Sequence, residues 1–196
     1  MCSKDLTNNI QDFEDLCKTS ISDNDIEIYK TIIHNLNVWV LDYVKNQSPI
    51  EKLKTNFANE FNKQTRKYKI AARKSNVVTI YRDMLYSNQI EENTTLSCLL
   101  QKKPSRNISG ITSITLVMSP HPNGQSFSCK HDCYYCPNEP AHEGNNFQDQ
   151  PRSYLFNEPA VRRANQNDFK AYDQMINRMN TLYANGHTID KLEIIL

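Results

Sequence analysis

The stretch ITSITLVMSPHPNGQSFSCKHDCYYC, residues 111–136, decides how the C-terminal part of the chain folds. Its first eight residues are mostly β-branched or apolar and end before Ser119-Pro120, which predicts a buried strand followed by a loop. The loop contains three cysteines separated by three and two residues, namely Cys129, Cys133 and Cys136. The sequence therefore predicts three thiols on one loop directly after a strand.

The sequence after this loop predicts a helix and a second strand. The stretch NQNDFKAYDQMINRMNTLYANG, residues 165–186, suggests five or six helical turns that end at Gly186. Its predicted apolar face contains Phe169, Tyr172, Met175, Ile176, Met179 and Leu182. KLEIIL, residues 191–196, is typical of a strand. Strand, helix and strand form a βαβ unit, so we expect a parallel pair, an α/β fold and a ligand site where the cysteine loop lies.

The sequence before the strand predicts helices. In residues 22–46, Ser22 and Asp25 form a possible capping pair. One apolar stripe follows at three-to-four spacing, comprising Tyr29, Ile32, Ile33, Leu36, Val40, Tyr43 and Val44. Packing of this stripe within its own domain is favoured over a partner-binding role.

Charge divides the chain into three parts: residues 1–60, 61–106 and 107–196. The middle part has 10 Lys/Arg against 3 Asp/Glu, a net charge of +7, although the whole chain has a net charge of +1. Tyr68, Tyr81 and Tyr86 are interspersed in the basic part, and tyrosines can stack on unpaired bases. Charge counting leaves a nucleic-acid surface and a solvated helix face equally supported.

The six cysteines are not expected to form disulfides. The chain starts without an apolar signal segment and contains no apolar run of membrane-spanning length, so we expect a cytoplasmic protein in a reducing compartment, with no membrane span. Three thiols on one loop favour an iron–sulfur cluster with one open iron. A zinc site remains open, with His121, His131 or His142 as the fourth ligand, and so do thiols without a metal.

Four further sequence segments support an interpretation of the cysteine pattern. They are KKPSRNISGITSITLVMSPHP, CYYCPNEP, QPRSYLFNEPAVRRANQN and NGHTIDKLEIIL. With the spacing C-x-x-x-C-x-x-C, they resemble the radical S-adenosylmethionine (SAM) superfamily and, more narrowly, the catalytic subunit of Elongator, the tRNA wobble-uridine (U34) acetyltransferase. The resemblance extends from about Phe61 to Leu196.

The resemblance implies site residues, cofactors and a reaction. Cys129, Cys133 and Cys136 would ligate a [4Fe-4S] cluster, and Tyr135 would lie near the nucleoside of SAM. The expected tRNA contacts are Lys63, Arg66, Lys67, Lys69, Arg73, Lys74, Lys102, Lys103 and Arg106. In the family, a radical made from SAM activates the acetyl group of acetyl-CoA for attachment to carbon 5 of the uridine, and the protein positions the reactants.

The run Ser153, Tyr154, Glu158, Pro159, Arg163 and Ala164 matches the family pattern S-Y-x-x-x-E-P-x-x-x-R-A. We expect a loop and a helix start from it more than direct chemistry, because an acidic residue before a proline suits the first turn of a helix.

The chain has only part of the family's pattern. The sequence stops at Leu196, so the resemblance predicts the N-terminal fragment of a radical-SAM partial (β/α) barrel, preceded by a helical basic region. An unpaired strand edge would then require a second polypeptide with the remaining barrel and the acetyltransferase domain. We expect the chain alone to be inactive. The alternatives are an inactive fragment and a tRNA-binding module with a structural zinc or a vestigial cysteine loop.

Overall fold

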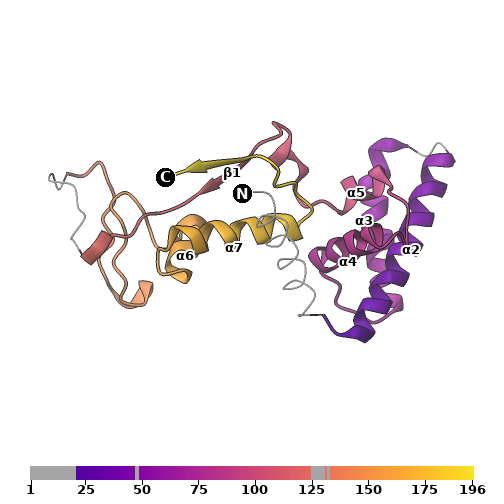
Figure 1. Ribbon diagram of the computed structural model, residues 1–196, viewed down its shortest axis with the longest axis horizontal. Helices are drawn as coiled ribbons and strands as arrows, with labels where there is room; N and C mark the ends of the chain where they lie inside the picture. The colour runs from indigo at the N-terminus through magenta and orange to yellow at the C-terminus, as the bar shows by residue number, and fades with distance from the viewer. Residues whose placement is uncertain (1–20, 47–48, 125–130, 132) are drawn as a thin grey trace, which may run out of the picture. The chain divides into compact units, whose positions relative to one another are not determined.

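The computed structural model describes residues 21–46, 49–124, 131 and 133–196, and these form two compact units (Figure 1). Unit 1 extends to Ile108 and includes Leu182–Thr188. Unit 2 comprises Ser109–Thr181 and Ile189–Leu196. Among the described residues, no helix has the length and apolar character needed to span a bilayer.

Unit 1 is built mainly from four helices, α2 (Asp23–Lys45), α3 (Ile50–Lys67), α4 (Lys74–Tyr86) and α5 (Thr94–Leu100). The short 3-10 helix η1 (Pro104–Asn107) follows them. Helix α2 begins as predicted, because the Ser22 hydroxyl accepts a hydrogen bond from the Asp25 amide at 3.2 Å. A side-chain cap of this kind satisfies one of the amides that the first turn of a helix leaves without a partner.

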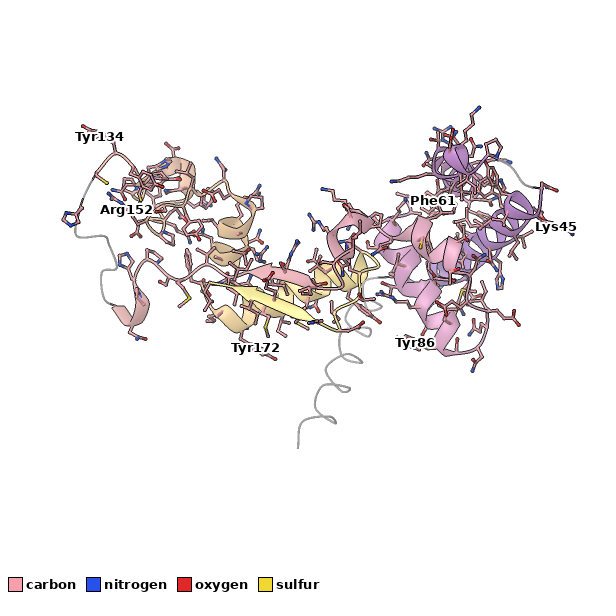
Figure 2. The ribbon with its side chains drawn as sticks, turned by 90° about the horizontal axis from the view of Figure 1, so that it is seen from above. Lys45, Phe61, Tyr86, Tyr134, Arg152 and Tyr172 are labelled. Carbon is pink, nitrogen blue, oxygen red and sulfur yellow. The ribbon has the colours of Figure 1, made fainter. Side chains whose placement is uncertain are left out.

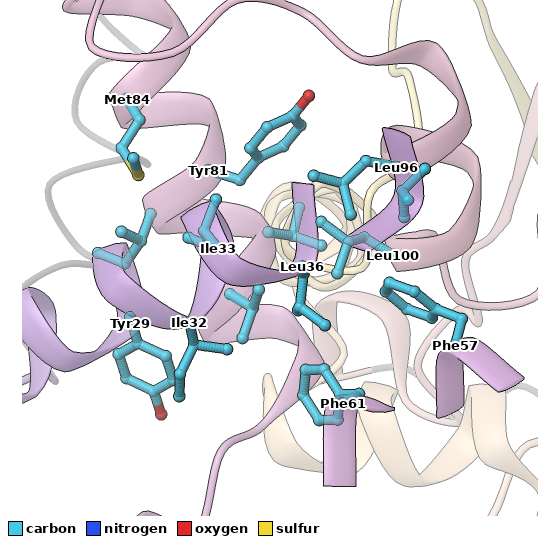
Figure 3. Close-up of a cluster of buried hydrophobic side chains, with 14 of the residues drawn as sticks. Tyr29, Ile32, Ile33, Leu36, Phe57, Phe61, Tyr81, Met84, Leu96 and Leu100 are labelled. Carbon is cyan, nitrogen blue, oxygen red and sulfur yellow. The ribbon is translucent and has the colours of Figure 1, made fainter. Parts of the chain in front are cut away.

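The apolar stripe of α2 forms the centre of unit 1. Ile32, Ile33, Leu36 and Val40 are completely buried against α3, α4 and α5. Figure 3 shows this cluster with Phe57 and Phe61 from α3 and with Leu96 and Leu100 from α5. The prediction of packing within the chain's own domain is confirmed for these residues. It is wrong for Val44, which is 55% exposed near the end of the helix.

Unit 2 contains the predicted parallel strand pair. β1 (Thr112–Thr115) and β2 (Leu192–Ile195) pair in register Thr112 with Leu192 and Thr115 with Ile195. Helices α6 (Pro159–Gln166) and the unit 2 part of α7 (Ala171–Ala184) lie on one side of the pair (Figure 1). The loop between β1 and α6 contains the 3-10 turns η2 (Pro122–Gly124) and η3 (Glu143–Asn145). Helices and a small parallel sheet agree with the predicted α/β class.

The two strands are less regular than the sequence predicted. β1 has four residues instead of seven or eight, and it alternates between buried and exposed side chains instead of being buried throughout. Ser113 is exposed, because the described residues cover one face of the pair and leave the other open. The ladder continues by one bond beyond the strand, from the Leu116 amide to the Ile195 carbonyl at 2.9 Å.

Helix α7 is also shorter than predicted. Its 14 residues make about four turns. Phe169 lies before the helix with a positive φ of 57°, and Tyr172 is 63% exposed, so the predicted apolar face is wrong at both residues. The predicted stop is confirmed. Gly186 has a φ of 89°, its amide donates to the Tyr183 carbonyl, and the His187 amide donates to the Leu182 carbonyl, which together form a Schellman motif.

Candidate functional site

The cysteine turn is the first part of the candidate site. Cys133 is exposed and Cys136 is half-buried, and both are free thiols. Cys129 lies outside the described residues. Tyr135 is 90% exposed, and its neighbour Tyr134 projects outward at the tip of the loop (Figure 2). Two of the three predicted thiols are therefore accessible on one turn, and the turn presents two uncovered aromatic rings between them.

The residues after Cys136 are fastened to the segment that precedes α6. The Ser153 amide donates to the Pro137 carbonyl at 3.1 Å, and the Gln150 amide donates to the Glu139 carbonyl at 2.9 Å. These two bonds bring the end of the cysteine motif beside the start of the S-Y-x-x-x-E-P run. Two motifs that the sequence separates by more than ten residues thus lie side by side.

Side chains complete this attachment. The Glu139 carboxylate accepts from the Phe156 amide at 2.7 Å. Asn145 is fully buried and donates to the Pro140 carbonyl at 2.9 Å. The buried side chain of Gln150 exchanges hydrogen bonds with the Asn165 amide of α6, at 2.8 Å and 3.4 Å. Each of these buried polar groups is paired, so the loop is held by hydrogen bonds more than by apolar packing.

The amide of Phe156 has a further effect on Glu139. Its hydrogen bond stabilises the ionised carboxylate, and it is the main reason why the pKa of Glu139 lies below the ordinary value of 4.5. Hydrogen bonds from His142 and Asn145 act in the same direction, while partial burial opposes them. Glu139 is therefore a carboxylate, and hence a pure acceptor, at neutral pH.

Two long side chains close the outer edge of β1. Backbone groups of successive strand residues point to opposite edges, and those of Thr112 and Leu116 point to β2. On the opposite edge, the Arg163 guanidinium donates to the Thr115 carbonyl at 2.7 Å. The side-chain amide of Gln174 both donates to and accepts from the backbone of Val117, at 3.0 Å in each case. These bonds hold β1 at the point where the chain leaves for the cysteine loop.

The S-Y-x-x-x-E-P-x-x-x-R-A run has the architectural contacts expected of it. Pro159 occupies the first turn of α6, and the Glu158 carboxylate accepts from the Leu155 amide at 2.9 Å. Ala164 is completely buried and packs with Val117 and Val161. Burial lowers the pKa of the Arg163 guanidinium below its ordinary value.

His121 and His142, which were considered as zinc ligands, pair with acidic side chains. His121 pairs with Asp149 at 2.6 Å, and His142 pairs with Glu139 at 3.2 Å. Within the ranges that the structure describes, no three His, Cys, Asp or Glu side chains are grouped for a metal ion. Cys129 lies outside those ranges. The donor set of the motif consists of thiols, which suits an iron–sulfur cluster.

The predicted tRNA contacts all belong to unit 1. All but one of them are exposed, namely Lys63, Arg66, Lys67, Lys69, Arg73, Lys102, Lys103 and Arg106. Lys63 also pairs with Glu60 at 3.4 Å. Arg66 and Lys67 lie in the last turn of α3, where positive charge also stabilises the helix dipole. These exposed cations are available to phosphate groups.

Lys74 is the exception. It is half-buried, its ammonium donates to the Leu99 carbonyl at 3.4 Å, and it lies 5.8 Å from the centre of the Phe57 ring. Burial, followed by repulsion from Lys54, lowers its pKa below 10.5. Lys74 is therefore a weaker candidate for a phosphate contact than its neighbours.

The three tyrosines of the basic segment also differ in how far they are exposed. Tyr81 belongs to the core with 3% exposure, and its hydroxyl accepts from the Asn93 amide at 3.1 Å, so it is not available for base stacking. Tyr68 is half-buried and accepts from Asn35 at 3.4 Å. Only Tyr86, at 68% exposure, presents its ring as the sequence interpretation requires.

Each unit also contains a hollow. In unit 1, a hollow of about 930 Å³ is lined by residues of α4 and α5 and by Gly186 and Thr188, and no predicted tRNA contact lines it. In unit 2, a hollow of about 460 Å³ beside Phe156 is lined by Arg162 and by Asn and Gln side chains. Neither hollow is lined by a cysteine.

Sequence reasoning assigned no role to Glu139, Asn145, Gln150 or Gln174. Glu139 stands in the quoted motif CYYCPNEP, so its position could have drawn attention. The other three are single amides without a periodic pattern, and only the tertiary structure shows that they are buried and paired.

Comparisons with known proteins identify relatives for about half of the chain. No protein-family model matches it. The tRNA uridine(34) acetyltransferase of Dehalococcoides mccartyi is 36% identical over 48% of this chain, and that of Methanocaldococcus jannaschii is 36% identical over 54%. Elongator complex protein 3 of Schizosaccharomyces pombe is 33% identical over 50%.

These matches cover 18%, 18% and 17% of the length of the three relatives, so the chain spans less than a fifth of each of them. Over about half of its own length, the chain is homologous to tRNA uridine(34) acetyltransferases and to Elongator complex protein 3, which confirms the family resemblance of its motifs.

Proposed function

We propose that this chain contributes the cluster-binding part of a radical-SAM system that modifies the wobble uridine of tRNA. The observation that carries the proposal is the position of the cysteine motif. It follows β1 of a parallel βαβ unit, on the loop where ligands of such sheets gather, in a chain related to tRNA uridine(34) acetyltransferases.

Cys129, Cys133 and Cys136 would hold a [4Fe-4S] cluster through three thiolates and leave one iron open. When bound, the cluster supplies the electron for reductive cleavage of SAM, from which the family's transfer of an acetyl-derived group to uridine carbon 5 starts. Cys133 is exposed and Cys136 is half-buried, and both are free thiols, which supports their proposed role as ligands. The ring of Tyr135 is uncovered, which supports the proposed contact with the nucleoside of SAM.

The exposed cations of unit 1 would bind tRNA. Eight of the nine predicted basic residues are exposed, and the ring of Tyr86 is exposed as well. This observation also supports the second candidate function, a tRNA-binding module in which the cysteine loop has no catalytic part. Measured tRNA affinity supports both candidates, whereas the metal content of the cysteine loop separates them.

The outer edge of β2 would receive the rest of the barrel. Side chains of Arg163 and Gln174 occupy the outer edge of β1, so within the described part of the chain the open edge of the pair is that of β2. The side chains of Ile194 and Ile195, which point to opposite faces of the pair, are 49% and 46% exposed. We propose that a further strand pairs with β2 at this edge.

Anaerobic reconstitution of the purified chain tests the proposed function. We expect about four irons and four sulfides per chain, and an electron paramagnetic resonance (EPR) spectrum of the reduced protein that changes when SAM is added. The matched variants are Cys133→Ser, which removes a ligand, and Cys98→Ser, which removes an exposed thiol of unit 1. Bound zinc contradicts the proposal. So does an iron content that is the same in Cys133→Ser as in the wild type.

A further inference from the structure

We infer that Glu139 is a positioning residue for the cysteine turn: its carboxylate fixes Cys136 by tying the residues that follow it to Phe156 and to the η3 turn. The inference deepens the proposed function, and it rests on that function only in treating the thiol of Cys136 as a cluster ligand. The attachment itself depends on the geometry alone.

The carboxylate accepts three hydrogen bonds from three directions. Oε2 accepts from the Phe156 amide at 2.7 Å, and Oε1 accepts from Asn145 Nδ2 at 3.3 Å and from His142 Nε2 at 3.2 Å. The side chain is 17% exposed, so water competes weakly for these bonds. Glu139 thereby joins the cysteine motif to segments that lie 3, 6 and 17 residues further along the chain.

The tautomer of His142 follows from its second partner. Its Nδ1 accepts from the Gly144 amide at 3.0 Å, so in the neutral ring the proton is on Nε2. Nε2 therefore donates to Glu139. The same turn is closed by the His142 amide, which donates to Asn145 Oδ1 at 2.8 Å. The donors that face Glu139 are thus held in place by hydrogen bonds that do not involve Glu139.

The connection from Glu139 back to Cys136 is short and stiff. Only Pro137 and Asn138 separate them, and Pro140 follows. Pro137 has a fixed φ, and Pro140 restricts Glu139 to extended conformations. The Pro137 and Glu139 carbonyls both accept backbone bonds from the facing segment. Because the connection has little conformational freedom, holding the Glu139 side chain in place also restrains the backbone at Cys136 and the orientation of its side chain.

A nearby acidic residue provides a matched control. Glu143 lies in the same loop, is exposed, and its carboxylate has no hydrogen bond or ion pair with the described residues. Glu139→Gln keeps one oxygen for the Phe156 amide and replaces the other with an NH₂ group that cannot accept from His142 or Asn145. Glu139→Ala removes every bond. Glu143→Gln changes the charge of the loop by the same amount and removes none of them.

The test begins without metal. We expect amide exchange of Phe156 to accelerate about tenfold in Glu139→Ala, and the alkylation rate of Cys136 to change severalfold relative to that of Cys133. Glu139→Gln should fall between Glu139→Ala and the wild type, and Glu143→Gln should match the wild type. The far-ultraviolet circular dichroism spectrum shows whether each variant is folded. If Glu139→Ala does not fold, the same ordering of Glu139→Gln, wild type and Glu143→Gln decides the inference.

Reconstitution then adds the functional readout. We expect less iron per chain in Glu139→Ala, or an EPR spectrum whose response to SAM is altered, with partial rescue in Glu139→Gln. Unchanged exchange of Phe156 and unchanged alkylation of Cys136 in both Glu139 variants would overturn the inference. If the wild type binds no iron, the proposed function fails, whereas the two metal-free measurements still decide the role of Glu139.

Discussion

The two units are stabilised by different interactions. Among the described residues, unit 1 surrounds α2 with an apolar cluster of 15 buried residues, from Ile21 just before α2 to Leu100 in α5. Unit 2 has smaller apolar contacts, such as Val117 with Val161 and Ala164. Among the described residues, four of the six buried polar side chains belong to unit 2, namely Thr112, Asn145, Gln150 and Gln174. Hydrophobic burial therefore dominates in unit 1, and specific hydrogen bonds are more important in unit 2.

This difference is important for function because the two mechanisms respond differently to substitution. An apolar core depends on volume and tolerates polar changes at its surface. A polar network depends on direction, and the loss of one partner leaves another group buried without a hydrogen bond. We therefore expect the cysteine loop to be sensitive to single polar substitutions that would have little effect in unit 1.

The largest effect is expected from the core of unit 1. Leu36→Ala removes a completely buried side chain from the middle of the α2 stripe, and it should lower the free energy of unfolding by about 2–5 kcal/mol. Urea denaturation followed by circular dichroism measures this change. Val38→Ala, on the exposed side of the same helix at 57% exposure, is the control and should change stability by much less. Equal effects of the two substitutions would contradict the burial of Leu36 on the inward face of α2.

The next effect is expected from the polar contact of α7 with β1. Gln174→Met keeps the length of the side chain but removes both hydrogen bonds to Val117, and it should cost about 2–3 kcal/mol. Amide exchange at Val117 should accelerate by the corresponding factor. Asn177→Met places the same side chain at an exposed position on the same helix and should leave Val117 protected. Protection of Val117 in Gln174→Met would show that packing, and not the amide, holds the strand.

The features predicted correctly from the sequence are those with a local signal. The stripe of α2, the Ser22 cap, the Gly186 stop and the parallel strand pair follow from periodicity, capping residues and topology. The cysteine motif is likewise a local spacing. Its ligand role stays a prediction, as do the tRNA contacts.

The features that were missed depend on tertiary contacts. Tyr81 was one of three tyrosines considered for base stacking, but it is buried in the core of unit 1, and a single tyrosine in a basic segment does not show which side will be covered. Tyr172 was expected to be buried, whereas the inward-facing residue of that turn is the polar Gln174. A hydrogen bond from a side chain to a distant backbone group leaves no periodic trace in the sequence, so the contacts of Gln174 and Glu139 could not be predicted, although Glu139 stands within a quoted motif.

A smaller effect is expected from the basic surface of unit 1. If Arg66 and Lys67 contact phosphates, the double substitution Arg66→Gln and Lys67→Gln should weaken tRNA binding and reduce the slope of log affinity against log salt by roughly two. Fluorescence anisotropy at several salt concentrations measures both quantities. Lys74→Gln should have less effect, because Lys74 is half-buried and bonded to Leu99.

The control for this measurement is Lys45→Gln, which removes an exposed charge from α2 outside the predicted surface (Figure 2). If Lys45→Gln reduces the salt slope as much as a single substitution at Arg66, tRNA binding responds to net charge and not to a defined surface. We expect none of these substitutions to affect the polar network of unit 2, because all of the substituted lysines and arginines belong to unit 1.

The smallest effect is expected from the titration of Glu139. Its pKa is below 4.5 in the folded chain and should return to that ordinary value when the loop is released. The carboxylate therefore stabilises the loop fully above pH 4.5, and the contribution is lost as the pH falls through the lower, folded pKa. The amide shift of Phe156, followed by nuclear magnetic resonance, should titrate with a midpoint below 4.5 in the wild type and in Glu143→Gln, and it should lose this transition in Glu139→Gln. A midpoint above 4.5 would mean that burial outweighs the hydrogen bond from Phe156, and the carboxylate would then be a poor anchor for the cysteine turn.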